Sequence, residues 1–128
     1  MKLNLKVFED QRIKLKGARQ EECGVTQISL ENAYYLLSKY GEPYSVDLTE
    51  EDGEWYVTVA WHVGVEMTDQ KFSGFSWGYN GEGPRGLKTL MKALGMEEKD
   101  GWTPYKDLPK ITTKLGFSAS QPSWRVYP

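Results

Sequence analysis

The chain has 128 residues and a formal net charge of −2 at pH 7, and its length fits a single domain spanning residues 1–128. Hydrophobic residues make up 39% of the chain and aromatic residues 13%, which excludes a disordered polypeptide. The weak negative charge excludes a global positive field of the kind that draws proteins onto nucleic acid or anionic membranes.

The single cysteine, Cys23, excludes an internal disulfide and a cysteine-rich zinc site, and it fits a reducing compartment. The first residues lack the apolar core of a signal peptide, and no run approaches the roughly 20 apolar residues of a membrane span. We therefore expect a cytoplasmic protein without a membrane partner. No spacing of ligand residues is typical of a metal site, so neither a metal nor a cofactor is predicted.

Two short strands are predicted near the N-terminus. Leu3, Leu5 and Val7 alternate with other residue types, and Ile13 and Leu15 repeat this rhythm. Alternation of period two is typical of a strand with one apolar face.

An amphipathic helix is predicted over residues 28–40. Its apolar stripe has the i, i+3, i+4, i+7 spacing and consists of Leu30, Ala33, Tyr34 and Leu37. Ser29 can cap the start of this helix, and Gly41 stands where a helix commonly ends.

A β-hairpin is predicted next, with arms over residues 44–49 and from Glu54 onward. The second arm has one apolar face, formed by Trp55, Val57, Val59, Trp61, Val63 and Val65. Its other face is mixed and includes Tyr56 and His62. Residues 71–79 then predict a further aromatic strand that runs antiparallel to the long one and leads into a glycine-rich turn.

A second amphipathic helix is predicted over residues 84–94, with Pro84 in its first turn and Gly95 after its end. A short helix is expected over 109–115, and the aromatic tail over 117–128 is expected to dock onto the body. The predicted fold is one α+β domain. It combines a twisted, mainly antiparallel sheet of four to five strands with two main helices that pack on one side of it.

The glycine-rich turn over residues 78–83 is the best candidate site. A helix start leaves backbone N–H groups unpaired and carries a partial positive charge, so Gly81 and Gly83 could bring an anion close to it. Arg85 and Lys88 would add positive charge. The alternative is a tight structural connection in which Glu82 balances Arg85. The glycine spacing matches neither the phosphate-loop pattern nor the dinucleotide fingerprint.

Aromatic side chains accompany this turn. Trp77 or Tyr79 could stack a nucleobase, with His62 on the polar face of the neighbouring strand. The alternative places Trp77 and Tyr79 at least partly in the core. No paired carboxylates, nucleophile elbow or other catalytic constellation is present, so a binding role is favoured over an enzyme, with a hydrolase using His62 as an outside option.

The pattern Phe75-x-Trp77-Gly78-Tyr79-x-Gly81-x-Gly83-Pro84-x-x-Leu87 resembles a signature in small proteins of phages, prophages and archaea, the DUF6166-like group. That signature also links a strand to an amphipathic helix. Family members usually have small or polar residues where this chain has Glu82 and Arg85. The resemblance implies a phage or mobile-element origin and hence a location in the host cell cytoplasm. It does not indicate any particular biochemical activity.

These observations predict a small phage-type binding protein, a counter-defence factor that sequesters an anionic nucleotide signal. The ligand-binding candidates are His62, Trp77, Tyr79, Gly81, Gly83, Arg85 and Lys88. The alternative is inhibition of a host defence protein through an aromatic surface, with Trp102, Tyr105 and Trp124 as its candidates. Nucleic acid is not an expected partner, and the sequence leaves homo-oligomers open.

Overall fold

A computed structural model describes residues 3–77, 79, 81–95, 114–118 and 121–127 of the chain. In these residues it contains the helices α1 (Lys6–Asp10), α2 (Thr26–Tyr40) and α3 (Glu82–Ala93). It also contains the strands β1 (Ser45–Glu51), β2 (Glu54–Val63), β3 (Glu66–Phe72), β4 (Lys114–Ser118) and β5 (Gln121–Tyr127). The molecule is an α+β protein with an antiparallel sheet, as predicted.

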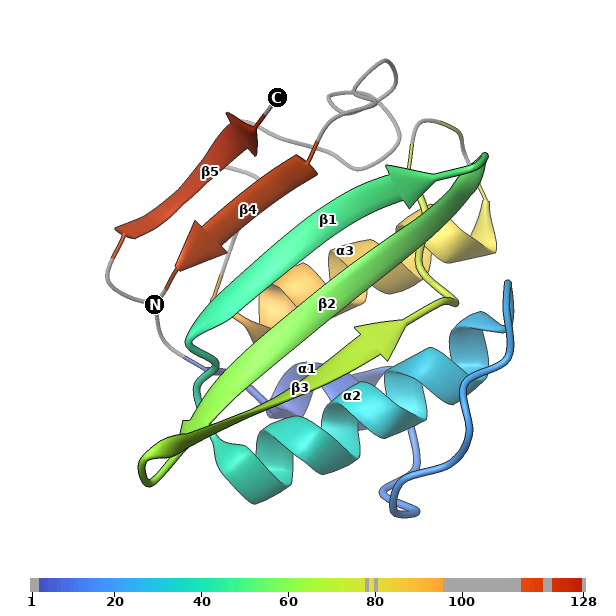
Figure 1. The fold of residues 1–128 in the computed structure, drawn as a ribbon. Helices are drawn as coiled ribbons and strands as arrows, with labels where there is room; N and C mark the ends of the chain where they lie inside the picture. Colours follow the sequence, from blue (N-terminus) through green and yellow to red (C-terminus); the bar gives the residue numbers. More distant parts are fainter. Residues whose placement is uncertain (1–2, 78, 80, 96–113, 119–120, 128) are drawn as a thin grey trace.

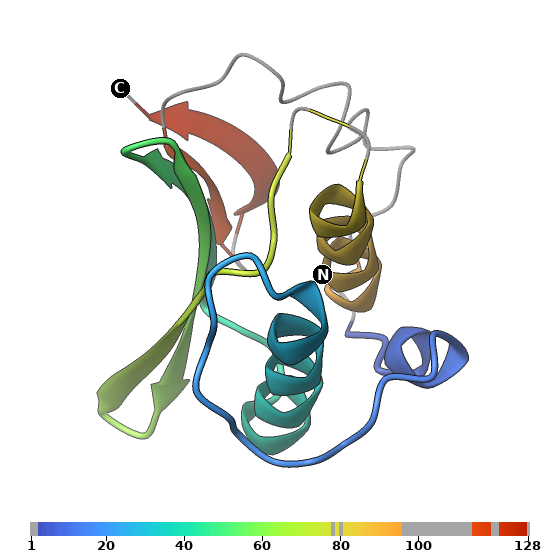
Figure 2. The ribbon, with the colours of Figure 1, turned by 90° about the vertical axis from the view of Figure 1, so that its right-hand side faces the viewer.

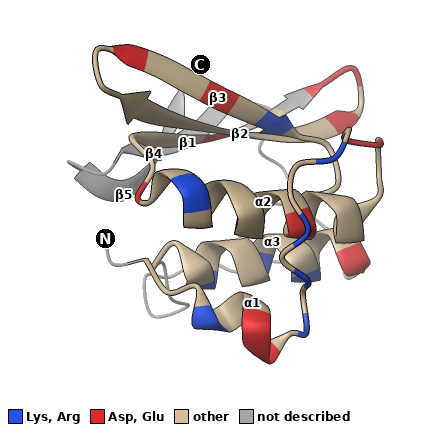
Figure 3. Ribbon diagram, turned by 90° about the horizontal axis from the view of Figure 1, so that it is seen from below, with Lys and Arg blue, Asp and Glu red and all other residues tan. Residues whose placement is uncertain are grey.

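The strands lie in the order β3-β2-β1-β4-β5, and each pairs antiparallel with its neighbours. All three helices lie on one side of the sheet, with α1 farther from the sheet than α2 (Figures 1 and 2). Each helix carries both acidic and basic residues, and Figure 3 shows the two signs interspersed over the described chain. None of the three described helices covers the other face of β1, β2 and β3.

Strand β2 forms the middle of two hairpins and follows the predicted alternation. Val57, Val59 and Trp61 point to the helices and are at most 1% exposed. The prediction was wrong at the far end of the apolar face, where Val63 is 45% exposed and Val65 fully exposed. The strand ends at Val63 because Gly64, with φ of 65°, begins the turn into β3, so the last two valines extend beyond the helices.

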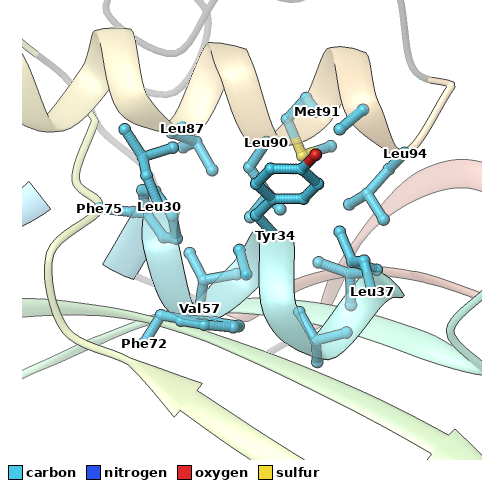
Figure 4. Close-up of a cluster of buried hydrophobic side chains, with 14 of the residues drawn as sticks. Leu30, Tyr34, Leu37, Val57, Phe72, Phe75, Leu87, Leu90, Met91 and Leu94 are labelled. Carbon is cyan, nitrogen blue, oxygen red and sulfur yellow. The ribbon is translucent and has the colours of Figure 1, made fainter. Parts of the chain in front are cut away.

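The core lies between the sheet and helices α2 and α3 (Figure 4). Leu30 of α2 lies near Leu87 of α3, Leu37 lies near Leu94 at the end of α3, and Val57 and Phe72 close the layer from the sheet side. Burying each such side chain contributes about 1.5–3 kcal/mol. The two helices lie where the apolar stripes predict them because one stripe can only be buried against the other and against the sheet.

The two predicted N-terminal strands are wrong. Residues 6–10 form α1, and residues 11–25 form neither helix nor strand. Phe8 is fully buried, and its ring stacks on that of Tyr34 with centroids 5.0 Å apart. Asn4 N–H donates to the carbonyl of Ala93 at 2.7 Å, which ties this segment to the end of α3. An apolar alternation this short is compatible with the period of a strand and with that of a helix. The contacts of this segment with α2 and α3 favour the helix.

A polar network fastens the connection between α1 and α2 to the body. Glu31 of α2 is 2% exposed and accepts a hydrogen bond from Arg19 Nη1 at 2.8 Å. Asn32, 1% exposed, exchanges hydrogen bonds with the backbone N–H and carbonyl of Arg19 at 2.8 and 2.9 Å. This network positions residues 19–24 in front of the first turn of α2.

The predicted strand over residues 71–79 is wrong beyond Phe72, where β3 ends. Gly74 donates its N–H to Ser29 Oγ at 2.9 Å, and its carbonyl accepts from Thr26 Oγ1 at 2.7 Å. These backbone groups bind side chains of α2 instead of a strand, so the chain leaves the sheet and crosses to α3.

The short helix expected over 109–115 lies outside the described residues up to position 113. Lys114 and Leu115 belong to β4, so a helix there is wrong for these two residues. Part of the aromatic tail forms β5, which pairs with β4. Trp102 and Tyr105 lie outside the described residues, as does the side chain of Trp124.

Candidate functional site

A cavity of about 400 Å³ opens at the end of the sheet where β1 turns into β2. We call it the turn cavity. Residues from four segments line it, at positions 23–24 and 26, 53–55, 73–76, and 79 with 82–83. It therefore lies between the β1–β2 turn, the chain that follows β3, and the starts of α2 and α3.

Close packing of the two helix starts forms the inner end of the turn cavity. Gly86 of α3 lies so close to the Thr26 side chain of α2 that a Cβ atom would clash with it. A Cβ on Gly83 would clash with the Ser76 hydroxyl. A Cβ on Gly74 would come within 2.5 Å of the Val25 carbonyl oxygen. These three glycines serve close approaches of chain segments, and none of them has a positive φ.

Glu54 is the best-anchored charged group of the turn cavity. Its Oε2 atom accepts hydrogen bonds from the Cys23 thiol at 3.1 Å and from the Tyr56 hydroxyl at 2.9 Å. These two hydrogen bonds lower the pKa of Glu54. The same bonds raise the pKa of Cys23 and that of Tyr56, because each donor would lose its bond to the carboxylate on ionising.

Aromatic rings form the outer part of the turn cavity. The Trp55 ring lies 5.7 Å from that of Tyr79, with the two planes at 49°. The Tyr79 hydroxyl is 2.8 Å from Ser76 Oγ, which holds its ring over the segment that follows β3. Tyr79 is 45% exposed, so one side of its ring is free to meet a ligand.

Of the ligand-binding residues predicted from the sequence, Tyr79 and Gly83 line the turn cavity. Gly81, Arg85 and Lys88 are not among its lining residues. Gly81 is the N-cap of α3 and has an extended backbone, with φ of −174°. No described residue forms an ion pair with Arg85, so the expected balance with Glu82 is not formed within this part of the chain.

Trp77 belongs to the core, as the structural alternative expects. Its side chain is 2% exposed, and its ring meets that of Trp55 edge-on at a centroid distance of 6.4 Å. Its Nε1–H group is buried without a hydrogen-bond partner among the described residues. A ring so placed has no free face for a nucleobase.

His62 lies at the other end of β2. Its ring packs edge-on against Tyr44, with centroids 4.4 Å apart. Glu54, which binds Cys23, precedes His62 by eight residues on the same strand, and this separation corresponds to roughly 26 Å. The structure therefore does not bring His62 together with Cys23 or with the turn cavity.

Sequence reasoning missed Cys23, Glu54 and Trp55 as members of one site. The register of β2 with β3 decides this, because Val57 pairs with Phe72 and so sets the start of β2 beside the residues that follow Phe72. A strand antiparallel to the long one was predicted over residues 71–79, but neither β3 over residues 66–72 nor its register with β2 was predicted. If the pairing of Val57 with Phe72 were known, the sequence alone would place the β1–β2 turn beside the glycine-rich turn.

No group of three or more His, Cys, Asp or Glu side chains able to hold a metal ion occurs in the described part of the chain. None of the described helices is long and apolar enough to cross a membrane. In comparisons with known proteins, no family model, no curated protein and no solved structure matches this chain.

Proposed function

We propose that this protein is a binding protein that holds a small ligand in the turn cavity. The cavity itself carries the proposal. Its volume lies in the range of small-molecule sites, and polar groups from four segments converge on it beside aromatic rings. The lining also rests on packed elements, since Gly74 is bonded to α2 through both its N–H and its carbonyl.

A thermal-shift screen of small metabolites and nucleotides tests whether any ligand binds. A ligand that binds only the folded state stabilises it by about 2.7 kcal/mol at a hundred times its Kd, which raises the melting temperature. Cys23 then locates the ligand. It is the only cysteine and lines the cavity, so an occupant of the turn cavity slows alkylation of this thiol.

A pair of bulky substitutions provides the control. Ser73 lines the turn cavity, so Ser73→Phe fills it and should abolish both the thermal shift and the protection of Cys23. Ser38→Phe adds the same ring on an exposed position of α2 and should leave both intact. A screen without a binder, or a binder unaffected by Ser73→Phe, overturns the proposal.

An anionic nucleotide signal, and with it the phage-type counter-defence role, stays a proposal for the outer surface of the same turn. Its support is the exposed Arg85 near the start of α3. Arg85→Glu should abolish nucleotide binding, whereas a ligand inside the turn cavity should be retained. Calorimetry with cyclic nucleotides and nucleoside phosphates measures this, and an absence of heat with the unmodified protein refutes it.

Inhibition of a host protein is a second candidate, and exposed apolar side chains at the other end of β2 favour it. Tyr44, Val63, Val65 and Met67 are between 45% and 102% exposed there. Val65→Asp should prevent copurification of a defined host protein and leave the ligand-induced thermal shift unchanged. If Val65→Asp still copurifies that host protein, the turn between β2 and β3 is not its binding site.

A further inference from the structure

The charges that line the turn cavity are acidic. Glu54 and Glu82 both contribute to the lining, and no Lys or Arg side chain does so among the described residues. Glu82 has no hydrogen bond or ion pair with any described residue. Its carboxylate is therefore available to a ligand.

The second carboxylate is held in position. The thiol of Cys23 and the hydroxyl of Tyr56 both donate to Oε2 of Glu54, and no described residue donates to Oε1. These bonds favour the ionised carboxylate. Glu54 therefore presents a negative charge with one oxygen still able to accept a hydrogen bond.

Aromatic rings stand beside these carboxylates. Trp55 and Tyr79 both line the turn cavity, at a centroid distance of 5.7 Å and an angle of 49°. The faces of such rings attract cations, and tryptophan does so most strongly. Phe75 adds a third ring from the inner side.

The positive ends of the two helix dipoles oppose the binding of a cation in the turn cavity only in part. Each carries about half a positive charge, whereas each carboxylate carries a full negative one. Glu82 lies in the first turn of α3 and offsets the dipole of that helix. Pro84 also has no N–H group, which removes one of the donors that an anion would use at this helix start.

We propose that the turn cavity selects an organic cation, an ammonium or guanidinium group on a flat apolar body, with Glu54 and Glu82 binding the charge and Trp55 and Tyr79 the body. This inference rests on the proposed function, since it assigns a ligand class to the same cavity. It does not depend on which natural compound carries the charge.

A matched series of indole compounds tests the charge preference. Tryptamine is cationic, tryptophol is neutral and indole-3-propionate is anionic, while the three share one ring and a similar side chain. Titration with detection by calorimetry, together with protection of Cys23 from alkylation, should show tryptamine binding most tightly and indole-3-propionate most weakly. The differences in affinity among the three compounds should become smaller at high salt, because salt screens the charges of these exposed carboxylates.

Two variants identify the carboxylates. Glu82→Gln should weaken tryptamine about two- to fivefold, as expected for one exposed charge pair, and leave tryptophol unchanged. Glu66→Gln removes an exposed charge from β3, outside the cavity lining, and should change neither. Glu54→Gln should act like Glu82→Gln and also release Cys23 from its carboxylate partner.

The outcomes separate this inference from the proposed function. If tryptophol or indole-3-propionate protects Cys23 as well as tryptamine does, the cavity binds ligands but does not select a cation. If Glu82→Gln and Glu54→Gln leave tryptamine affinity unchanged, the carboxylates do not bind the charge. If no compound of the screen or of this series protects Cys23, both proposals fail.

Discussion

The two ends of β2 show how one strand can serve opposite purposes. At its first residues, the Trp55 ring contacts that of Tyr79 in the chain after β3, and Trp55 lines a cavity together with residues at the two helix starts. At its last residues, Val63 and the turn after it extend beyond the helices and stay exposed. The strand has the same apolar alternation throughout. What differs is whether other segments return to cover it.

The walls of the turn end depend on glycine, and this gives the largest expected effect. Gly74→Ala should destabilise the fold by about 1–3 kcal/mol, because the added Cβ would press on the backbone of Val25. Urea unfolding measures this change. At the hairpin end, the side chain of Val65 is fully exposed, so Val65→Thr should stay within about 0.5 kcal/mol. Equal costs for the two variants would contradict the comparison.

The connection that leads to the turn cavity depends on Glu31, and Glu31→Gln should cost about 1–2 kcal/mol at neutral pH. Burial disfavours ionisation of Glu31, but hydrogen bonds from Gln27 and Arg19 and the charges of Lys16 and Arg19 outweigh it and lower its pKa below 4.5.

Because this pKa is lowered on folding, the contribution of Glu31 is complete above about pH 4.5, the unfolded value, and is lost as the pH falls through the folded pKa. Unfolding measured at successive acidic pH values should show a shallower loss of stability in Glu31→Gln than in the unmodified protein. Glu66→Gln, on the exposed surface of β3, serves as the control. An unchanged pH slope in Glu31→Gln would contradict the assignment.

A buried tryptophan near each end sharpens the comparison further. Trp61 Nε1 donates to the Gly41 carbonyl at 2.9 Å, whereas Nε1 of Trp77 has no partner among the described residues. Both rings are at most 2% exposed, so replacement by Phe removes a similar volume. Trp61→Phe should therefore cost about 1 kcal/mol more than Trp77→Phe. Thermal unfolding of the two variants measures the difference, and a larger loss for Trp77→Phe would refute it.

The smallest effect concerns the rate at which Cys23 is alkylated. The hydrogen bond to Glu54, with burial and the carboxylate charge, raises the pKa of this thiol above 9.0. Glu54→Gln removes the carboxylate, so the pH midpoint of iodoacetamide alkylation should move down. Glu22→Gln, a neighbour in sequence with an exposed side chain, should leave that midpoint in place. An unchanged midpoint in Glu54→Gln would show that this contact does not persist in solution.

The sequence by itself determined the elements with sustained periodicity. Two apolar stripes predicted α2 and α3 to within two residues at each end, and the alternation from Trp55 to Trp61 predicted β2, because each pattern repeats long enough to fit only one period. The glycine-rich turn that the sequence marked as a candidate site borders the turn cavity, through Tyr79 and Gly83.

Only the tertiary structure decided what lies beside that turn. The short N-terminal alternation became a helix because Phe8 stacks on Tyr34, and Trp77 was taken into the core. Cys23 and Glu54, 31 residues apart in the chain, meet because strand register and helix packing place them there. Contacts between distant segments follow from how several faces are buried together, and no local pattern contains that information.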